Sequence, residues 1–215
     1  IIIDLADTTQ KQNEKGTSSA LARGVAHAIK DRGFTIGGFT AYLTSNVFKG
    51  AGVSSSAAFE VLVAEIFNVL YLDGRLSAVD KAVISQYSEN VYFGKPCGLL
   101  DQCGIAIGSL SALDFCVPTN PTIQKYDMPK GYSLVITNTG GDHANLTSHY
   151  AAIRSEMESV AGVFGKKVLR EVDYRELLDN IPLVRKSVCD RAVLRAMHFF
   201  EENERVERAC LALKD

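Results

Sequence analysis

The chain has 215 residues, of which 47% are hydrophobic and 22% charged, and its formal net charge is −2. These values are typical of a globular protein with one large or two smaller domains, and they exclude a disordered or fibrous chain. Lys and Arg are not concentrated in any stretch, so the sequence predicts no nucleic-acid partner. No apolar run approaches the roughly 20 residues that a membrane-spanning helix requires, and we expect no membrane partner.

Five cysteines are scattered along the chain, and none belongs to a Cys-x-x-Cys pair. An odd, dispersed set is typical of free thiols in a reducing compartment, so we expect a cytoplasmic protein. The opening Ile1-Ile2-Ile3 is too short for the apolar part of a signal peptide. It has the character of an interrupted strand, which indicates that the chain starts inside a larger fold.

The first half of the chain mixes helical and extended patterns. Apolar residues at helical spacing predict a helix over residues 17–32 with a serine N-cap. Residues 34–47 alternate well enough for a strand or hairpin. Residues 57–72 are apolar on most sides, which is typical of a buried helix, and residues 77–90 predict another helix with a serine N-cap. A glycine-containing loop is expected over residues 94–104.

The second half changes from extended to helical patterns. Residues 111–117 and 132–138 are expected to be strands, separated by a proline-containing linker at 118–131. From Thr147 to the end, the pattern predicts three helical segments. This order indicates an α+β fold, with a first lobe at residues 1–130 and the start of a second lobe at 131–215.

The segment Gly50-Ala51-Gly52-Val53-Ser54-Ser55-Ser56-Ala57-Ala58 is a candidate phosphate-binding loop. Its glycines allow a sharp turn and a close approach of a ligand to the backbone. Its serines lie beside the first backbone N–H groups of the following helix, where those groups and the helix dipole favour an anion. A serine hydroxyl there also suits magnesium, which prefers oxygen ligands. The expected phosphate contacts are Gly50, Gly52, Ser54, Ser55, Ser56 and Ala57.

A simpler alternative is a junction whose serines only cap the helix. Serines are common at helix starts, but two glycines followed by three serines and an apolar helix form a more specific combination, and we favour the phosphate interpretation. The segment is not a Walker loop, because it lacks Gly-Lys-Ser/Thr. A Rossmann fingerprint would require a third glycine.

Residues 48–58 resemble the second motif of the GHMP kinases, which has the form Pro-x-Gly-x-Gly-Leu-Ser-Ser-Ser-Ala-Ala. Phe48 stands in place of the usual proline and Val53 in place of the leucine, and neither change removes a phosphate ligand. The resemblance implies ATP as the phosphoryl donor. It also implies the GHMP kinase fold, with an N-terminal lobe like a domain of a small-subunit ribosomal protein and a helix-rich C-terminal lobe.

Two acidic residues form a second constellation. Asp101 lies among glycines and apolar residues, where a loop can hold a carboxylate at a defined point for general-base work on a hydroxyl. Glu89, twelve residues earlier, is a candidate magnesium ligand. Each acid taken alone is more often a solvated surface charge or a helix cap.

The segment Cys97-Gly98-Leu99-Leu100-Asp101-Gln102 is similar to the Cys-Gly-Ile-Met-Asp-Gln of the galactokinase branch, which also has a glutamate twelve residues upstream. The resemblance implies that Asp101 is the catalytic aspartate and contacts the sugar together with Gly98. It also implies that Glu89 and Ser56 bind magnesium.

A third match begins at Asn138 and ends at Tyr150, where the galactokinase branch has Asn-Ser-x-x-x-His-x-Leu-x-x-Ser-x-Tyr. Asn138, His143, Ser148 and Tyr150 align without a gap, and Asn145 replaces the leucine. The resemblance implies that Tyr150 contacts the sugar. Without the motif, we would favour an ordinary turn histidine with a satisfied ring for His143.

The N-terminal Gly-Arg-x-Asn-Leu-x-Gly-Glu-His-x-Asp-Tyr motif of the branch and its C-terminal glycine-rich motif match nothing in the chain. We therefore expect a central fragment, inactive alone if the flanking parts are missing. The implied function is an ATP- and Mg²⁺-dependent sugar 1-kinase that converts galactose to galactose 1-phosphate, as a monomer or homodimer. The alternatives are a non-catalytic sugar- and ATP-binding regulator, or a kinase of a related sugar such as galacturonate or N-acetylgalactosamine.

Overall fold

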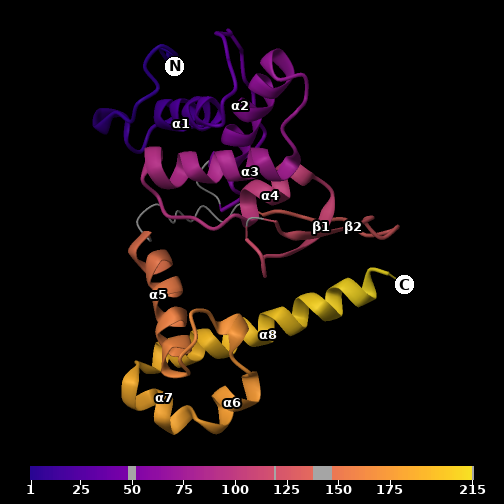
Figure 1. The fold of residues 1–215 in the computed structure, drawn as a ribbon. Coiled ribbons are helices and arrows are strands. Elements are labelled where there is room, and N and C mark those ends of the chain that lie inside the picture. Colours follow the sequence, from indigo (N-terminus) through magenta and orange to yellow (C-terminus); the bar gives the residue numbers. More distant parts are fainter. Residues whose placement is uncertain (48–51, 119, 138–146, 215) are drawn as a thin grey trace. The chain divides into compact units, whose positions relative to one another are not determined.

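The computed structural model describes residues 1–47, 52–118, 120–137 and 147–214 (Figure 1). The chain divides into two compact units, Ile1–Ala144 and Asn145–Asp215. The lobe boundary expected near residue 130 remains a prediction. Within the described ranges, no helix is both long and apolar enough to cross a membrane.

The first unit is built mainly from helices. A short 3-10 helix, η1, precedes α1, and a π-helix, η2, continues directly from α3 (Figure 1). The strands β1 and β2 pair in antiparallel register, with Leu110 opposite Tyr126. The bounds are η1 Gln12–Glu14, α1 Ser18–Asp31, α2 Ser55–Tyr71, α3 Ala78–Tyr87, η2 Ser88–Phe93, α4 Leu100–Ile107, β1 Leu110–Asp114 and β2 Thr122–Tyr126.

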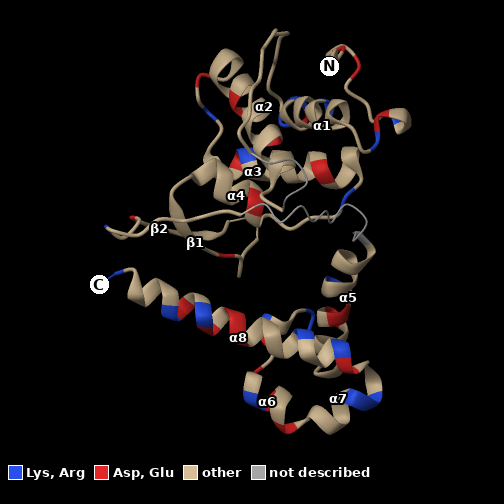
Figure 2. Ribbon diagram, turned by 180° about the vertical axis from the view of Figure 1, so that it is seen from behind, with Lys and Arg blue, Asp and Glu red and all other residues tan. Residues whose placement is uncertain are grey.

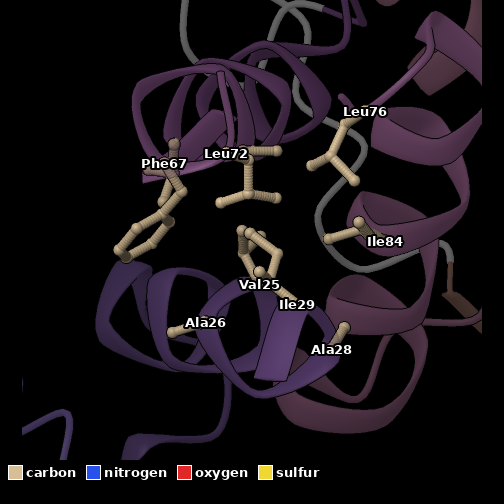
Figure 3. Packing of buried hydrophobic residues seen from close by; sticks show 10 residues of the cluster. Val25, Ala26, Ala28, Ile29, Phe67, Leu72, Leu76 and Ile84 are labelled. Carbon is tan, nitrogen blue, oxygen red and sulfur yellow. The ribbon is translucent and has the colours of Figure 1, made fainter. Parts of the chain in front are cut away.

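The main core of this unit lies between α1, α2 and α3. Figure 3 shows Val25 and Ile29 of α1 pointing toward Leu72 and Phe67, with Ile84 of α3 beside them. These side chains are at most 3% exposed. Each one contributes about 1.5–3 kcal/mol through removal of its apolar surface from water, so this cluster fixes the positions of the helices.

The π-helix η2 packs very closely against α1. A Cβ atom added at Gly24 would lie 2.5 Å from Ser88 Oγ and 2.9 Å from Tyr92 Cγ, so the contact requires glycine on α1. Ser88 Oγ donates a hydrogen bond of 2.6 Å to Leu21 O, and Tyr92 Oη donates one of 2.8 Å to Thr8 O. This contact sets the position of η2, which carries Glu89.

The three helices expected in this unit are confirmed, with small shifts. Thr17 rather than a serine caps α1, whereas Ser77 caps α3 in a capping box with Asp80, as the serine N-cap predicted. The expected burial of α2 is only partly correct, because one of its faces exposes Leu62, Val69 and Leu70.

The expectations for extended segments need correction. No strand forms at residues 1–3, 34–47 or 132–137, and β2 lies inside the segment expected to be a linker. An alternating pattern becomes a strand only where its backbone groups find a partner ladder, and among the described residues that ladder is β1 with β2. The expected strand at 111–117 is confirmed as β1, whereas Asn138 lies outside the described residues.

The second unit is helical, as expected from Thr147 onward. Its core contains Val160, Leu177, Val184 and Val193, all at most 5% exposed. Two breaks were expected from the sequence, at Gly165, which has a φ of 68°, and at Asn180, which separates α6 from α7. The expectation of three segments was wrong in its last part, because Val188 and Cys189 take extended backbone conformations and divide that segment into α7 and α8. The bounds are α5 Thr147–Val163, η4 Leu169–Glu171, α6 Tyr174–Asp179, α7 Ile181–Ser187 and α8 Asp190–Ala212.

The long helix α8 is strongly charged along its C-terminal half. Figure 2 shows acidic and basic residues interspersed along it. Pairs one turn apart bring opposite charges together, as in Arg205 with Glu201 and Arg208 with Glu204. Such exposed pairs contribute only about 0.3–0.5 kcal/mol each, so α8 is held mainly by the apolar residues of its first half.

Candidate active site

The start of α2 has an unusual backbone. Gly52 has a φ of 74°, and Ser54, the N-cap residue, also has a left-handed conformation with a φ of 58°. Such a conformation costs a non-glycine residue about 1–3 kcal/mol, and residues that adopt it are found mainly at functional sites. Gly50 lies outside the described residues.

The serines at this helix start do not act as an ordinary cap. The Ser54 side chain makes no capping hydrogen bond, whereas Thr17 and Ser77 cap α1 and α3 in the usual way. The first N–H groups of a helix have no partner within it. At α2 the N-cap side chain leaves them available to an anion, and this geometry favours the phosphate interpretation over the capping alternative.

Ser56 and Glu89 meet in space although they are 33 positions apart. Ser56 Oγ donates a hydrogen bond of 2.9 Å to Glu89 Oε1. Glu89 is 3% exposed, and the ammonium of Lys95 lies 3.7 Å from the same carboxylate oxygen. The two residues expected to bind magnesium are therefore adjacent, and a cationic group already lies beside them.

These residues fit a magnesium ion bound together with a nucleotide. A hydroxyl and a carboxylate supply the hard oxygen ligands that magnesium prefers, and such ions commonly take only one or two protein ligands beside phosphates and water. Among the described residues, no group of three or more His, Cys, Asp or Glu side chains gathers around a common point.

Two further polar side chains are buried behind Glu89. Gln102 Nε2 donates a hydrogen bond of 2.9 Å to Glu89 Oε2, so both oxygens of Glu89 are engaged. Glu60, on α2, is completely buried. Burial, followed by the nearby charge of Glu89, raises the pKa of Glu60 to about 9, although the Gln102 side chain and Lys95 act in the opposite direction. Glu60 is therefore a neutral acid at pH 7.

Asp101 lies in the first turn of α4, not in the loop expected over residues 94–104. The helix dipole favours a carboxylate at this position, and Leu99 and Cys103 anchor the turn in a small apolar cluster with Ala82 of α3. The Asp101 side chain is exposed and makes no hydrogen bond or ion pair with any described residue. The backbone that carries this carboxylate is therefore anchored, and the carboxylate itself is open to a ligand.

The segment before α4 is fixed by side chains of the preceding helices. Asn90 Oδ1 accepts a hydrogen bond of 2.7 Å from Cys97 N, and Gln86 Nε2 donates one of 3.2 Å to Cys97 O. Gly98 follows, exposed and with open space where a Cβ would lie. This expected sugar contact is accessible.

Tyr150 lies in the first turn of α5, in the second unit, and is 49% exposed. Two other residues of the same sequence match, Asn138 and His143, lie outside the described residues. The sugar-binding role of Tyr150 therefore remains a prediction.

The sequence did not single out Glu60 or assign a role to Gln102. Glu60 had a detectable signal, because it is an isolated carboxylate one turn after Ser56 in an otherwise apolar stretch. A charged residue in such a stretch is either exposed or has a polar function. Gln102 gave no such signal, because only the tertiary structure shows that it contacts Glu89.

The segment from α1 to the end of α4 matches a known family. Residues 17–109 match the family described as GHMP kinases N terminal domain. The matched range contains the serine run, Glu89 and Asp101. This segment is therefore similar to the N-terminal domain of the GHMP kinases. The resemblance inferred from the motifs is confirmed for this segment.

Relatives are similar to the chain over most of its length. It is 33% identical over 193 residues to a galactokinase from Clostridium tetani, covering 87% of this chain and 48% of that protein. It is 29% identical over 208 residues to a galactokinase from Pyrococcus furiosus, covering 97% and 56%. The chain thus spans about half the length of the curated relatives it matches.

A solved structure confirms the fold. The crystal structure of Lactococcus lactis galactokinase complexed with galactose matches 98% of this chain and 54% of that chain, with a TM-score of 0.71 and 19% identity. The chain has the GHMP kinase fold, in agreement with the expected α+β class.

Proposed function

We propose that the protein carrying this chain is an ATP-dependent sugar 1-kinase that phosphorylates galactose. One observation carries the proposal: at the start of α2, where the N-cap side chain makes no capping bond, Ser56 Oγ lies 2.9 Å from Oε1 of the buried Glu89. This pairing of a helix N-terminus with a hydroxyl and a carboxylate suits a nucleotide phosphate and its magnesium ion. The choice of galactose rests on the curated relatives, which are galactokinases.

The residues of the site have distinct roles in this reaction. The N–H groups at the start of α2, from Ser55 to Ala57, bind ATP phosphate oxygens. Ser56 and Glu89 would hold magnesium, which neutralises negative charge on the phosphates. Asp101 accepts or orients the proton of the sugar 1-hydroxyl. The oxygen of that hydroxyl forms a bond to the γ-phosphorus while the bond from the γ-phosphorus to ADP breaks. Gly98 and Tyr150 are the proposed sugar contacts.

We also infer that the reaction takes place in a reducing compartment such as the cytoplasm. All five cysteines have free thiols, and two of them, Cys116 and Cys189, are exposed. Exposed free thiols are typical of proteins kept reduced by cellular thiol systems.

A coupled ADP-release assay on the full-length protein tests the proposal. Galactose-dependent turnover is expected, and Asp101→Asn should lower kcat at least 100-fold, the usual minimum contribution of a positioned proton acceptor. Because Asp101 is exposed and has no partner among the described residues, its replacement should change the melting temperature little. Asp31→Asn, at the exposed end of α1, is the matched control and should keep full activity.

Two outcomes would contradict the proposal. If turnover persists in Asp101→Asn, Asp101 has no catalytic role in the reaction. Tight binding of sugar and ATP without ADP release by the unaltered protein would instead indicate a sensor. Running the assay with galacturonate and N-acetylgalactosamine tests the choice of sugar.

A further inference from the structure

Behind the proposed magnesium site lies a buried polar pair, Glu60 and Gln102. Glu60 is completely buried and Gln102 is 1% exposed. Neither carboxyl oxygen of Glu60 has a hydrogen-bond partner among the described residues, and the same is true of Gln102 Oε1. Buried polar atoms without partners are rare in native proteins and call for a specific explanation.

The side chain of Gln102 acts on both buried glutamates. Gln102 donates its amide N–H to Glu89 Oε2 at 2.9 Å, and its side chain also influences the carboxyl group of Glu60. Gln102 therefore connects Glu60 with Glu89. Ser56 engages the other oxygen of Glu89, so the Glu89 carboxylate is fixed from both sides.

The chemistry of the pair explains the unpartnered atoms. A neutral carboxylic acid has an O–H donor, and an amide oxygen is an acceptor. Glu60 is completely buried and no described group donates to its carboxyl oxygens, an environment that favours the protonated, neutral form of a carboxyl group. A bond from this O–H to Gln102 Oε1 would satisfy both groups and keep the Gln102 N–H directed at Glu89.

We propose that Glu60 and Gln102 are positioning residues for the divalent cation, which hold the Glu89 carboxylate in the orientation that presents Oε1 beside Ser56. The inference rests on the proposed function, because it assumes that Ser56 and Glu89 bind the cation of a cation–nucleotide complex. Groups that orient a metal ligand typically change metal affinity 10- to 100-fold when removed.

The test measures cation affinity rather than turnover. Mn²⁺ binding to the full-length protein is followed by electron paramagnetic resonance at a saturating concentration of a non-hydrolysable ATP analogue. Glu60→Leu should weaken Mn²⁺ binding about tenfold or more, because it removes the donor to Gln102. Glu60→Gln keeps a donor and an acceptor in the same volume, and should bind Mn²⁺ within about twofold of the unaltered protein.

Glu65→Gln is the matched control. Glu65 lies on the same helix and forms an ion pair with Lys81, at 2.6 Å, away from Glu89. This variant loses a carboxylate of α2 without touching the pair, and its Mn²⁺ affinity should not change.

Two results would overturn the positioning role. One is a folded Glu60→Leu variant that binds Mn²⁺ as tightly as the unaltered protein, and the other is an equal loss in Glu60→Gln and Glu60→Leu. If Glu60→Leu does not melt cooperatively, Gln102→Met replaces it, with the same expected weakening and the same contradictory result. Absence of sugar turnover in an unaltered protein that binds Mn²⁺ and nucleotide would overturn the proposed function alone.

Discussion

Glu60 gives the stability of the first unit an unusual dependence on pH. Its pKa is raised from 4.5 to about 9 in the folded state, so between these values the folded chain keeps a proton that the unfolded chain has released. By proton linkage, this contribution to stability is fully present below pH 4.5. It decreases toward pH 9 by at most about 1.4 kcal/mol per pH unit.

Glu60→Gln removes this titration. The variant should lose less stability than the unaltered protein between pH 5.5 and 8.5, because an amide does not titrate in either the folded or the unfolded state. Urea unfolding followed by circular dichroism at several pH values measures the effect. Parallel stability profiles of the two proteins would show that Glu60 ionises normally in the folded state.

Glu14 should have the opposite pH dependence. Arg23 is 2% exposed and donates hydrogen bonds of 2.7 and 2.8 Å to the two carboxylate oxygens of Glu14. The hydrogen bonds from Arg23 lower the pKa of Glu14, so the stability they provide is present above pH 4.5 and is lost as the pH falls through the lowered folded-state pKa.

Replacing Glu14 by Gln leaves a buried guanidinium without its counter-charge. The free energy of unfolding at pH 7 should fall by about 3 kcal/mol, the usual cost of breaking a buried pair. The difference from the unaltered protein should shrink as the pH falls below 4.5 and through the lowered folded-state pKa of Glu14, because the carboxyl group is then protonated in both states. Urea titrations at pH 7 and pH 3 check this, and a difference that does not depend on pH would contradict it.

At the scale of elements, the contact between α1 and η2 depends on Gly24. Alanine is the better helix former by about 1 kcal/mol. However, its Cβ would lie 2.5 Å from Ser88 Oγ and 2.9 Å from Tyr92 Cγ, and overpacking of this kind costs about 1–3 kcal/mol. Ser88 cannot turn away without losing its bond to Leu21 O, so we expect the steric term to prevail and Gly24→Ala to destabilise the protein by about 1–2 kcal/mol.

Gly104 is the matched control for this prediction. It lies inside α4 and has open space where a Cβ would be. Gly104→Ala should therefore raise the free energy of unfolding by about 0.5–1 kcal/mol. Thermal melts of both variants test this: the melting temperature should fall for Gly24→Ala and rise for Gly104→Ala. If Gly24→Ala instead stabilises the protein, η2 can move away from the added Cβ atom at little energetic cost.

The helices of the first unit could be predicted from sequence because their signals are local. Ser77 and Asp80 form a capping box within one turn, and the apolar spacing of residues 17–32 identifies α1. The prediction of a strand at residues 34–47 was wrong for the opposite reason. A strand requires a partner strand, which can lie anywhere along the chain. Alternation alone could not supply that partner.

The candidate site was predictable only in part, for the same physical reason. The motifs brought Ser56, Glu89 and Asp101 to attention, and the structure places the first two in contact. Their chemical roles remain predictions. The proposed bond between Glu60 and Gln102 would join α2 to α4, and no spacing within either helix could have indicated it.

At the scale of the whole molecule, the chain has separate cores in its two units. The core of the second unit is formed by described residues between Met157 and Phe200. A polypeptide of residues 145–215 contains this whole core, and domains of about 60 residues can fold alone, although marginally. We expect it to be helical by circular dichroism and to melt cooperatively.

Two neighbouring substitutions test whether that melt reports the native core. Val184 is completely buried, whereas Leu183 is 52% exposed. In the 145–215 polypeptide, Val184→Ala should cost about 2 kcal/mol, which lowers the melting temperature by roughly 8–16 °C for a domain of this size. Leu183→Ala should change it little. Equal shifts, or a melt without cooperativity, would show that this unit does not fold by itself.

A second polypeptide, beginning at residue 131, tests the lobe boundary expected from the sequence. If residues 131–144 belong to the second lobe, they bury additional surface there, and the longer polypeptide should melt at a higher temperature than residues 145–215. If they belong to the first lobe, they have nothing to pack against in this polypeptide, and the two melting temperatures should coincide. The comparison therefore decides between a boundary near residue 130 and one after Ala144, where the first compact unit ends.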